Sequence, residues 1–299
     1  MSAAGRVAIV GPTASGKSAV ALHVAEQAGA ALISVDSMQV YRGMDIGTAK
    51  PTPAEQARVR HHLIDLVDPS EAFTVAQFQQ AYRALDASLG PAILVGGTGL
   101  YHRAVLDDLD LPGEWPALRA ELLTQPAAAL HARLTELDPA AAAKMEPTNQ
   151  RRVVRALEVT LGSGRPFSSF GPGLDAYPPN PIAQIGLRWN RAVLADRIQQ
   201  RVEQMLAAGL LGEVARLLAA PGGLSRTAAQ ALGYKELIEH LRGDVTFDAA
   251  VARIVVRTRQ FAVRQLRWFG RDPRVAWVDV EHDPVAEVAP VVLTALENA

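Results

Sequence analysis

The sequence predicts an α/β fold, in which a parallel sheet carries helices on both faces and a helical subdomain is inserted into the chain. Two observations predict the sheet. Short apolar runs alternate with helical patterns in the first third of the chain, and this alternation returns near its end. A third observation predicts the insertion, because residues 113–181 are instead rich in alanine and proline. We therefore expect a core of residues 1–112 and 182–299.

The first elements follow in a regular order. Residues 6–10, 31–35 and 92–95 are apolar runs of strand length. Residues 17–28 have a helical pattern, and another helix follows residue 95. Parallel strands need crossover connections of this kind, so the order fits a parallel sheet.

After the insertion the strand pattern resumes at residues 187–189. Helical patterns cover 193–208, 228–241 and 249–269, and 275–279 is a short strand candidate. Glycine, proline and serine cluster between 163 and 181, where we expect a loop that leads back to the core.

The composition excludes several classes of protein. Of the 299 residues, 49% are hydrophobic and 20% charged, which allows a sizeable core. The absence of cysteine excludes disulfides, thiolate metal sites and cysteine nucleophiles. We find no secretory signal and no apolar run long enough to cross a bilayer, so we expect a cytoplasmic protein with no membrane partner. A net charge of −1 means that any contact with nucleic acid is local.

The strongest local signal is a glycine-rich loop between the first strand and the first helix. It fits the pattern G-x-x-x-x-G-K-[ST], in which backbone N–H groups at a helix N-terminus surround phosphate oxygens. The lysine adds a positive charge, and the last hydroxyl suits Mg2+ held against the phosphates. The loop consists of Gly11, Pro12, Thr13, Ala14, Ser15, Gly16, Lys17 and Ser18. It predicts a P-loop NTPase-like core with Mg2+ at Ser18, and leaves open whose phosphate is bound.

An acidic residue follows the second predicted strand. Asp36 lies at the carboxyl end of the 31–35 run, where open α/β sheets place their ligands. A carboxylate there could take a proton from an attacking group, a step worth about 10²–10⁴-fold in rate. The simpler alternative is that Asp36 caps a helix or orders the turn.

Longer blocks of sequence are more specific than either signal alone. The blocks are residues 11–18, 36–51, 61–65, 95–101, 155–159, 233–236 and 264–269. In these blocks, taken in this order, the chain closely resembles the tRNA dimethylallyltransferase (tRNA isopentenyltransferase) family. Eukaryotic members carry a C-terminal zinc finger, for which this chain has no cysteine, so it resembles the bacterial form.

The resemblance implies a reaction. The dimethylallyl group of dimethylallyl diphosphate would pass to the exocyclic amine of the adenine 3′ of the anticodon, and diphosphate would leave. This amine is a poor nucleophile because its lone pair is shared with the ring, so a base at Asp36 and a stabilised leaving group both make chemical sense. Asp36, Thr13 and Arg197 would be catalytic, and the whole loop 11–18 would bind the diphosphate. Arg201 could assist Arg197 or form a surface ion pair.

The resemblance also implies a set of residues that bind the tRNA anticodon stem-loop. An adenine in this loop must be flipped out of its stack to reach the site. Asp36, Ser37, Met38, Gln39 and Thr98 would surround it, and Arg119, Arg151, Arg152, Arg155, Tyr234 and Lys235 would face the RNA. Ordinary solvated charge is the alternative for the arginines. We expect a monomer.

A basic tract gives independent support for RNA. Residues 253–271 contain six arginines and no acidic residue, with Phe261, Trp268 and Phe269 between them. Arginines along a helix suit phosphate contact, and aromatic rings can stack on bases. The aromatic residues are equally compatible with the core side of an amphipathic helix.

Three other functions fit parts of the sequence. A small-molecule kinase would bind ATP in the loop and use Asp36 to activate a hydroxyl. An adenylate isopentenyltransferase would use a free nucleotide as acceptor. A non-catalytic RNA-binding switch would not need Asp36.

Overall fold

The computed structural model describes residues 5–85, 89–171 and 173–299. The chain forms two compact units, Met1–Asp107 with Pro179–Ala299, and Asp108–Pro178. We call the first the sheet unit and the second the helical unit. Their limits lie a few residues from those expected from the sequence.

The sheet unit is built on a parallel sheet. Among the described residues it has six strands in the order β3-β2-β4-β1-β5-β6, and every neighbouring pair is parallel. The strands are β1 (Arg6–Val10), β2 (Ala31–Ser34), β3 (His61–His62), β4 (Ala92–Val95), β5 (Ala183–Trp189) and β6 (Val275–Val280). The predicted fold class is confirmed. Strand β5 is longer than expected because Gln184 and Gly186, although buried, interrupt its apolar run.

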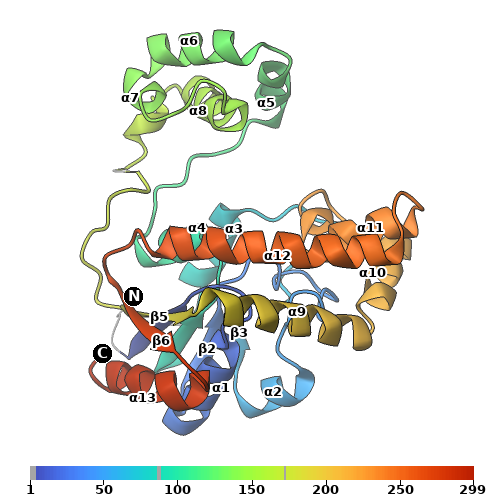
Figure 1. Cartoon of the computed structure of the whole chain (residues 1–299). Coiled ribbons are helices and arrows are strands. Elements are labelled where there is room, and N and C mark those ends of the chain that lie inside the picture. Colours follow the sequence, from blue (N-terminus) through green and yellow to red (C-terminus); the bar gives the residue numbers. More distant parts are fainter. Residues whose placement is uncertain (1–4, 86–88, 172) are drawn as a thin grey trace. The chain divides into compact units, whose positions relative to one another are not determined.

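Helices cover both faces of this sheet (Figure 1). Val7 and Ile9 of β1 pack in one core cluster with α1 (Lys17–Ala28) and α13 (Pro284–Glu297). Ala8, between them, packs on the opposite face with α3 (Val75–Arg83) and α4 (Gly99–Leu106). Neighbouring residues of a strand point to opposite faces, so a strand that is buried on both sides is apolar throughout.

The remaining helices of the sheet unit lie mostly after β5. They are α2 (Pro53–Arg58), α9 (Arg191–Ala207), α10 (Leu210–Ala219), α11 (Tyr234–Leu241) and α12 (Phe247–Phe269), with a short 3₁₀ helix η3 (Ala228–Gln230). The single helix predicted over 228–241 is wrong. Ala231 has a non-helical ψ of 143° and Gly233 has a φ of 86°, so the helix is interrupted between η3 and α11.

The helical unit has a hydrophobic core of its own. Its elements are α5 (Pro116–Leu123), α6 (Ala127–Leu137), α7 (Pro139–Ala142), α8 (Gln150–Ser163) and a 3₁₀ helix η2 (Phe167–Ser169). Leucines of α5 and α6 pack against the apolar face of α8. Over the described ranges of both units, no helix combines the length and apolar character needed to cross a membrane.

Candidate active site

Three loops meet at one edge of the sheet. The phosphate loop, residues 11–18, follows β1; Asp36 lies two residues after β2, and Thr98 three residues after β4. Strands β2, β4 and β1 are parallel neighbours. Their carboxyl ends therefore share the edge at which open α/β sheets bind ligands.

The phosphate loop is held through its carbonyl groups, by one donor of its own and two from outside the loop. Three of them accept side-chain hydrogen bonds: Pro12 from Lys17 Nζ (2.5 Å), Ala14 from Arg197 Nε (2.9 Å) and Ser15 from Trp189 Nε1 (2.9 Å). Because these carbonyls turn toward their donors, the N–H groups of the loop can point at an anion. Ser18 is exposed in the first turn of α1.

Two glycines allow the loop to approach its neighbours closely. Gly16 has a φ of 95°, and a Cβ there would lie 2.5 Å from Pro284 Cγ at the start of α13. Gly11 has a φ of 136°, and its Cβ would lie 2.9 Å from the Leu187 carbonyl oxygen of β5. Both positions therefore favour glycine for its backbone and for the lack of space.

The two arginines predicted on α9 differ in their contacts. Arg197 stacks on the Trp189 ring, with its Cζ 4.3 Å from the ring centroid, while its Nε holds the Ala14 carbonyl. The positive charge of Arg201 lowers the pKa of both Lys17 and Asp36. Arg197 thus contacts the phosphate loop directly, whereas Arg201 interacts electrostatically with Lys17 and Asp36.

The pKa values of Lys17 and Asp36 are both shifted in the direction that favours the uncharged side chain. Burial and the repulsion from Arg201 lower the pKa of Lys17 to about 7, although Asp36 opposes the shift. Burial raises the pKa of the Asp36 carboxyl above its ordinary value, against the N–H groups of Met38 and Gln39 and the nearby cations. Shifts of this kind are typical of functional sites.

Asp36 also orders its own turn. Its Oδ1 accepts from Met38 N–H at 2.8 Å, as the simpler interpretation of the sequence supposed. Thr98 Oγ1 accepts from Ser37 N–H at 3.1 Å, so the loops that follow β2 and β4 are joined. The Met38 side chain packs against the core.

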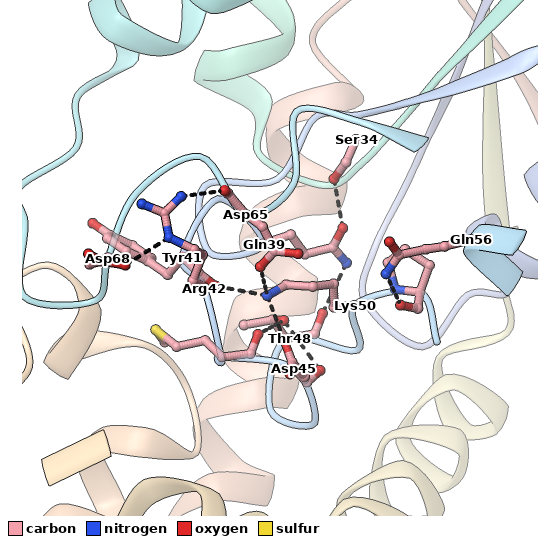
Figure 2. A network of polar contacts seen from close by, with 12 residues as sticks. Ser34, Gln39, Tyr41, Arg42, Asp45, Thr48, Lys50, Gln56, Asp65 and Asp68 are labelled. Atoms are coloured by element: carbon pink, nitrogen blue, oxygen red, sulfur yellow. Dashed lines mark hydrogen bonds and ion pairs between the residues drawn. The ribbon is translucent and has the colours of Figure 1, made fainter. Parts of the chain in front are cut away.

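Residues 36–50, which we call the 36–50 loop, are held by a polar network (Figure 2). The Lys50 side chain is 2% exposed, and its Nζ contacts Asp45 and Asp65 carboxylates at 2.6 Å each and the Tyr41 carbonyl at 2.8 Å. Gln39 donates to the carbonyls of Thr48 and Ala49 and accepts from Ser34 Oγ. The Gln39 amide is thus used within the loop, which argues against its predicted contact with adenine.

A buried acid on α10 also fixes this loop. Glu213, 2% exposed, accepts from the N–H groups of Asp45 (3.1 Å), Ile46 (2.8 Å) and Gly47 (3.3 Å). Tyr234 donates its hydroxyl to the same carboxylate at 2.5 Å.

Tyr234 was expected to face RNA, but the structure places it in the core. The side chain is fully buried, and a Cβ on Gly47 would lie 2.4 Å from its ring. Burial, followed by the hydrogen bond to Glu213, raises the pKa of the Tyr234 hydroxyl. This position argues against RNA contact and gives Tyr234 a structural task. The neighbouring Lys235 is partly exposed.

The predicted arginines of the helical unit fall into two pairs. Arg119 and Arg155 both bind the buried carboxylate of Glu158, at 2.8 and 3.1 Å. Burial would raise the pKa of Glu158, but these arginines and the Trp115 N–H hold it below its ordinary value. Arg151 and Arg152 are exposed in the first turn of α8.

The basic tract forms most of α12. Arg253, Arg257, Arg264 and Arg267 recur at spacings of four, seven and three residues, so they share one face of the helix. The first two pair with Glu239 and Glu236. Within the described parts of the chain, Arg264 and Arg267 have no acidic partner and are exposed.

The sequence did not point to three residues that shape the site. Trp189 and Glu213 support the loops as described above, and Gln265 of α12 contacts two of them. Each of the three forms a hydrogen bond with a loop residue that is more than 160 positions away in the sequence. Only the position of Gln265 within the 264–269 block could have drawn attention to it.

Comparison with known proteins identifies the family of the chain. The family model of the IPP transferases matches residues 39–272. The tRNA dimethylallyltransferase of Desulforudis audaxviator is 45% identical over 284 residues, with 92% of each chain covered. The corresponding protein of Kineococcus radiotolerans is 48% identical over 286 residues, which cover 91% of this chain and 90% of that protein.

A solved structure extends the similarity to the fold. The tRNA isopentenylpyrophosphate transferase of Bacillus halodurans is 40% identical, with a TM-score of 0.71 and coverage of 98% of this chain and 97% of that chain. The resemblance predicted from sequence blocks is confirmed. The chain belongs to the IPP transferase family.

Proposed function

We propose that this enzyme transfers the dimethylallyl group of dimethylallyl diphosphate to the exocyclic amine of the adenine 3′ of the anticodon in tRNA. One observation carries the proposal. The phosphate loop after β1 and the Asp36 carboxylate after β2 share one edge of the sheet, where a diphosphate and a proton acceptor are both needed. The names of the relatives supply the substrate class.

The diphosphate lies in the phosphate loop. Its oxygens accept from backbone N–H groups of residues 14–18, and Lys17 turns from the Pro12 carbonyl to the anion. Arg197 and Arg201 add positive charge at the point where the leaving group gains negative charge.

The reaction breaks one bond and makes another. The adenine nitrogen attacks the first carbon of the allylic chain, the bond from this carbon to the diphosphate oxygen breaks, and the nitrogen loses a proton. Asp36 takes this proton, as its raised pKa favours. No covalent intermediate with the enzyme is required.

A magnesium ion fits the residues that are present. The described residues hold no group of three or more histidine, aspartate or glutamate side chains placed to bind a metal. Mg2+ is commonly held by substrate phosphates, water and one or two protein oxygens, so the exposed hydroxyl of Ser18 is sufficient. Bound there, the ion would neutralise charge on the diphosphate.

The acceptor side is read by the loops after β2 and β4. Ser37 and Thr98, which hydrogen-bond to each other, lie beside Asp36 and supply polar groups for a flipped adenine. Arg264 and Arg267 of α12 contact RNA phosphates, as do Arg151 and Arg152 of the helical unit.

The test uses dimethylallyl diphosphate labelled in its alkyl chain. The protein and Mg2+ are incubated with an unmodified anticodon stem-loop that carries the adenine, or with AMP, in parallel. Label in the RNA is the expected result. A third reaction with labelled ATP and no isoprenoid tests for phosphoryl transfer.

The other results discriminate between the remaining functions. Label in AMP alone would keep the chemistry but move the acceptor to a free nucleotide. Label in neither acceptor, with consumption of ATP, would indicate a kinase and overturn the proposal.

A further inference from the structure

One buried side chain of α12 contacts two of the three loops at the active-site edge. Gln265 is 6% exposed, and its side chain contacts the loops that follow β1 and β4. Its neighbour Trp268 packs so close to Gly99 that a Cβ at Gly99 would lie 2.1 Å from the indole. The inner face of α12 is therefore in contact with the phosphate loop and with the loop after β4.

Both ends of the Gln265 amide are used. Oε1 accepts from Thr13 N–H of the phosphate loop at 2.8 Å, and Nε2 donates to the Gly97 carbonyl after β4 at 3.0 Å. A carboxamide has one acceptor end and one donor end about 2 Å apart, so these two bonds set the spacing between the two loops.

The contact continues to Asp36 through close backbone packing. A Cβ at Gly97 would lie 2.2 Å from Gln265 Nε2, and a Cβ at Gly96 would lie 2.0 Å from the Val35 carbonyl oxygen. Val35 directly precedes Asp36. Thr13, Gln265, Gly97, Gly96 and Val35 therefore form an unbroken series of contacts from the phosphate loop to the carboxylate.

We propose that Gln265 is a positioning residue, which fixes the distance between the phosphate loop and the residues that hold the acceptor amine. This inference rests on the proposed function. The carbon to be attacked is attached to the diphosphate, whereas the amine is placed by Asp36 and Thr98. Gln265 sets how far apart the two are held, without touching either.

The consequence for the reaction is specific. A misplacement of about 1 Å between reacting groups can cost about 10²-fold in rate while both substrates still bind. Loss of Gln265 should therefore lower kcat and leave the KM values nearly unchanged. A purely structural role would lower stability and leave kcat of the folded protein intact.

The variant Gln265→Met keeps the length of the side chain and removes its donor and its acceptor. Gln265→Asn keeps the amide on a stem too short to reach both loops. Gln79→Met is the matched control, because Gln79 is also buried and donates to a carbonyl, that of Ala104, between α3 and α4. For each variant, kcat, both KM values and the urea midpoint are measured with the anticodon stem-loop as acceptor.

We expect Gln265→Met to lose about 10- to 100-fold in kcat, with each KM within about threefold of wild type. The kcat of Gln265→Asn should lie between those of Gln265→Met and wild type. Gln79→Met should lose stability but keep its kcat within about twofold of wild type. If Gln265→Met does not fold, Gln265→Asn carries the same test.

Three results would overturn the inference. An unchanged kcat, a loss no larger than that of Gln79→Met, or a rise in KM alone would each assign Gln265 to another role. If the wild-type protein transfers no label to RNA, the proposed function itself fails, and the inference fails with it. Normal wild-type transfer with an unaffected Gln265→Met variant removes the inference alone.

Discussion

The two loops to which we assign the two substrates are held in different ways. The phosphate loop is fixed through its carbonyl groups, which accept from its own Lys17 and, from outside the loop, from Trp189 and Arg197. The 36–50 loop is fixed by two buried charged side chains. Lys50 belongs to the loop and pairs with Asp65, and Glu213 of α10 accepts from N–H groups of the loop. The first arrangement leaves N–H groups for a ligand, and the second uses up most of its polar groups.

The difference shows which residues can act on a substrate. In the 36–50 loop, Gln39 and Lys50 are saturated with hydrogen bonds. Asp36 and Ser37, at its beginning, keep polar groups next to the phosphate loop. We therefore expect the chemistry at the first two residues and a supporting role for the rest of the loop.

The largest expected effect comes from Asp36, the first residue of the 36–50 loop. Asp36→Asn keeps an oxygen that can accept from Met38 N–H but cannot take a proton. We expect kcat to fall by about 10²–10⁴-fold, with both dissociation constants within a few-fold of wild type. Single-turnover transfer and equilibrium binding measure the two quantities.

Asp68→Asn is the control, because Asp68 is exposed and forms an exposed ion pair with Arg42. Its kcat should stay within about twofold of wild type. Equal turnover by Asp36→Asn and Asp68→Asn would eliminate Asp36 as the base.

The second effect tests the phosphate loop. Lys17→Met removes a charged donor, and we expect dimethylallyl diphosphate to bind about 10- to 100-fold more weakly, since hydrogen bonds to charged groups contribute about 1.5–3 kcal/mol. Calorimetric titration measures the affinity. Lys144→Met, an exposed lysine of the helical unit, is the control and should bind normally.

The pH dependence of Lys17 has opposite signs for binding and for stability. With a pKa of about 7, Lys17 loses its proton as pH rises through 7, so the affinity for diphosphate should fall. Its pKa is about 10.4 when unfolded, and the unfolded chain therefore binds more protons between pH 7 and 10.4, so its contribution to stability should rise there. Lys17→Met should remove both trends. An identical pH profile of binding in wild type and variant would contradict the assignment.

The third effect tests the support of the 36–50 loop. Tyr234→Phe removes one of the four donors to the buried Glu213 carboxylate. We expect the free energy of unfolding to fall by about 1–3 kcal/mol, measured as a lower urea midpoint with an unchanged slope. Glu239→Gln breaks an exposed pair with Arg253 and should cost at most about 1 kcal/mol. A larger loss for Glu239→Gln than for Tyr234→Phe would count against the network.

The smallest effect lies outside both loops, on α12. Arg267→Gln should weaken RNA binding by only a few-fold and lower the slope of log K against log salt by about 1, as for one phosphate contact. Arg259→Gln is the matched control, because Arg259 lies on another face of the helix and reaches the Ala195 carbonyl. The same change in salt slope for both variants would show that α12 has no preferred face for RNA.

Local patterns predicted the fold well. Strand β1 and helix α1 have the predicted limits, because their apolar periods and flanking glycines are local signals. The two-residue strand β3 has no pattern of its own and exists only through its pairing with β2. The break at Gly233 was missed because the residues on both sides of it favour a helix.

The position of the phosphate loop between β1 and α1 was predictable, because the pattern of residues 11–18 is local. The tasks of Tyr234 and Gln39 could not be predicted, because the groups they contact come from other segments. Block similarity indicated that Tyr234 matters, but only the structure distinguishes burial against Glu213 from exposure to RNA.

The contacts among Gly47, Glu213 and Tyr234 limit which substitutions these positions can accept during evolution. A side chain at position 47 would strike the Tyr234 ring, and a smaller residue at position 234 would leave the Glu213 carboxylate short of a donor. Single substitutions at any of the three should therefore be selected against, and tolerated changes should arise as paired or triple replacements. The three positions lie 166 and 21 residues apart, yet they should evolve as one unit.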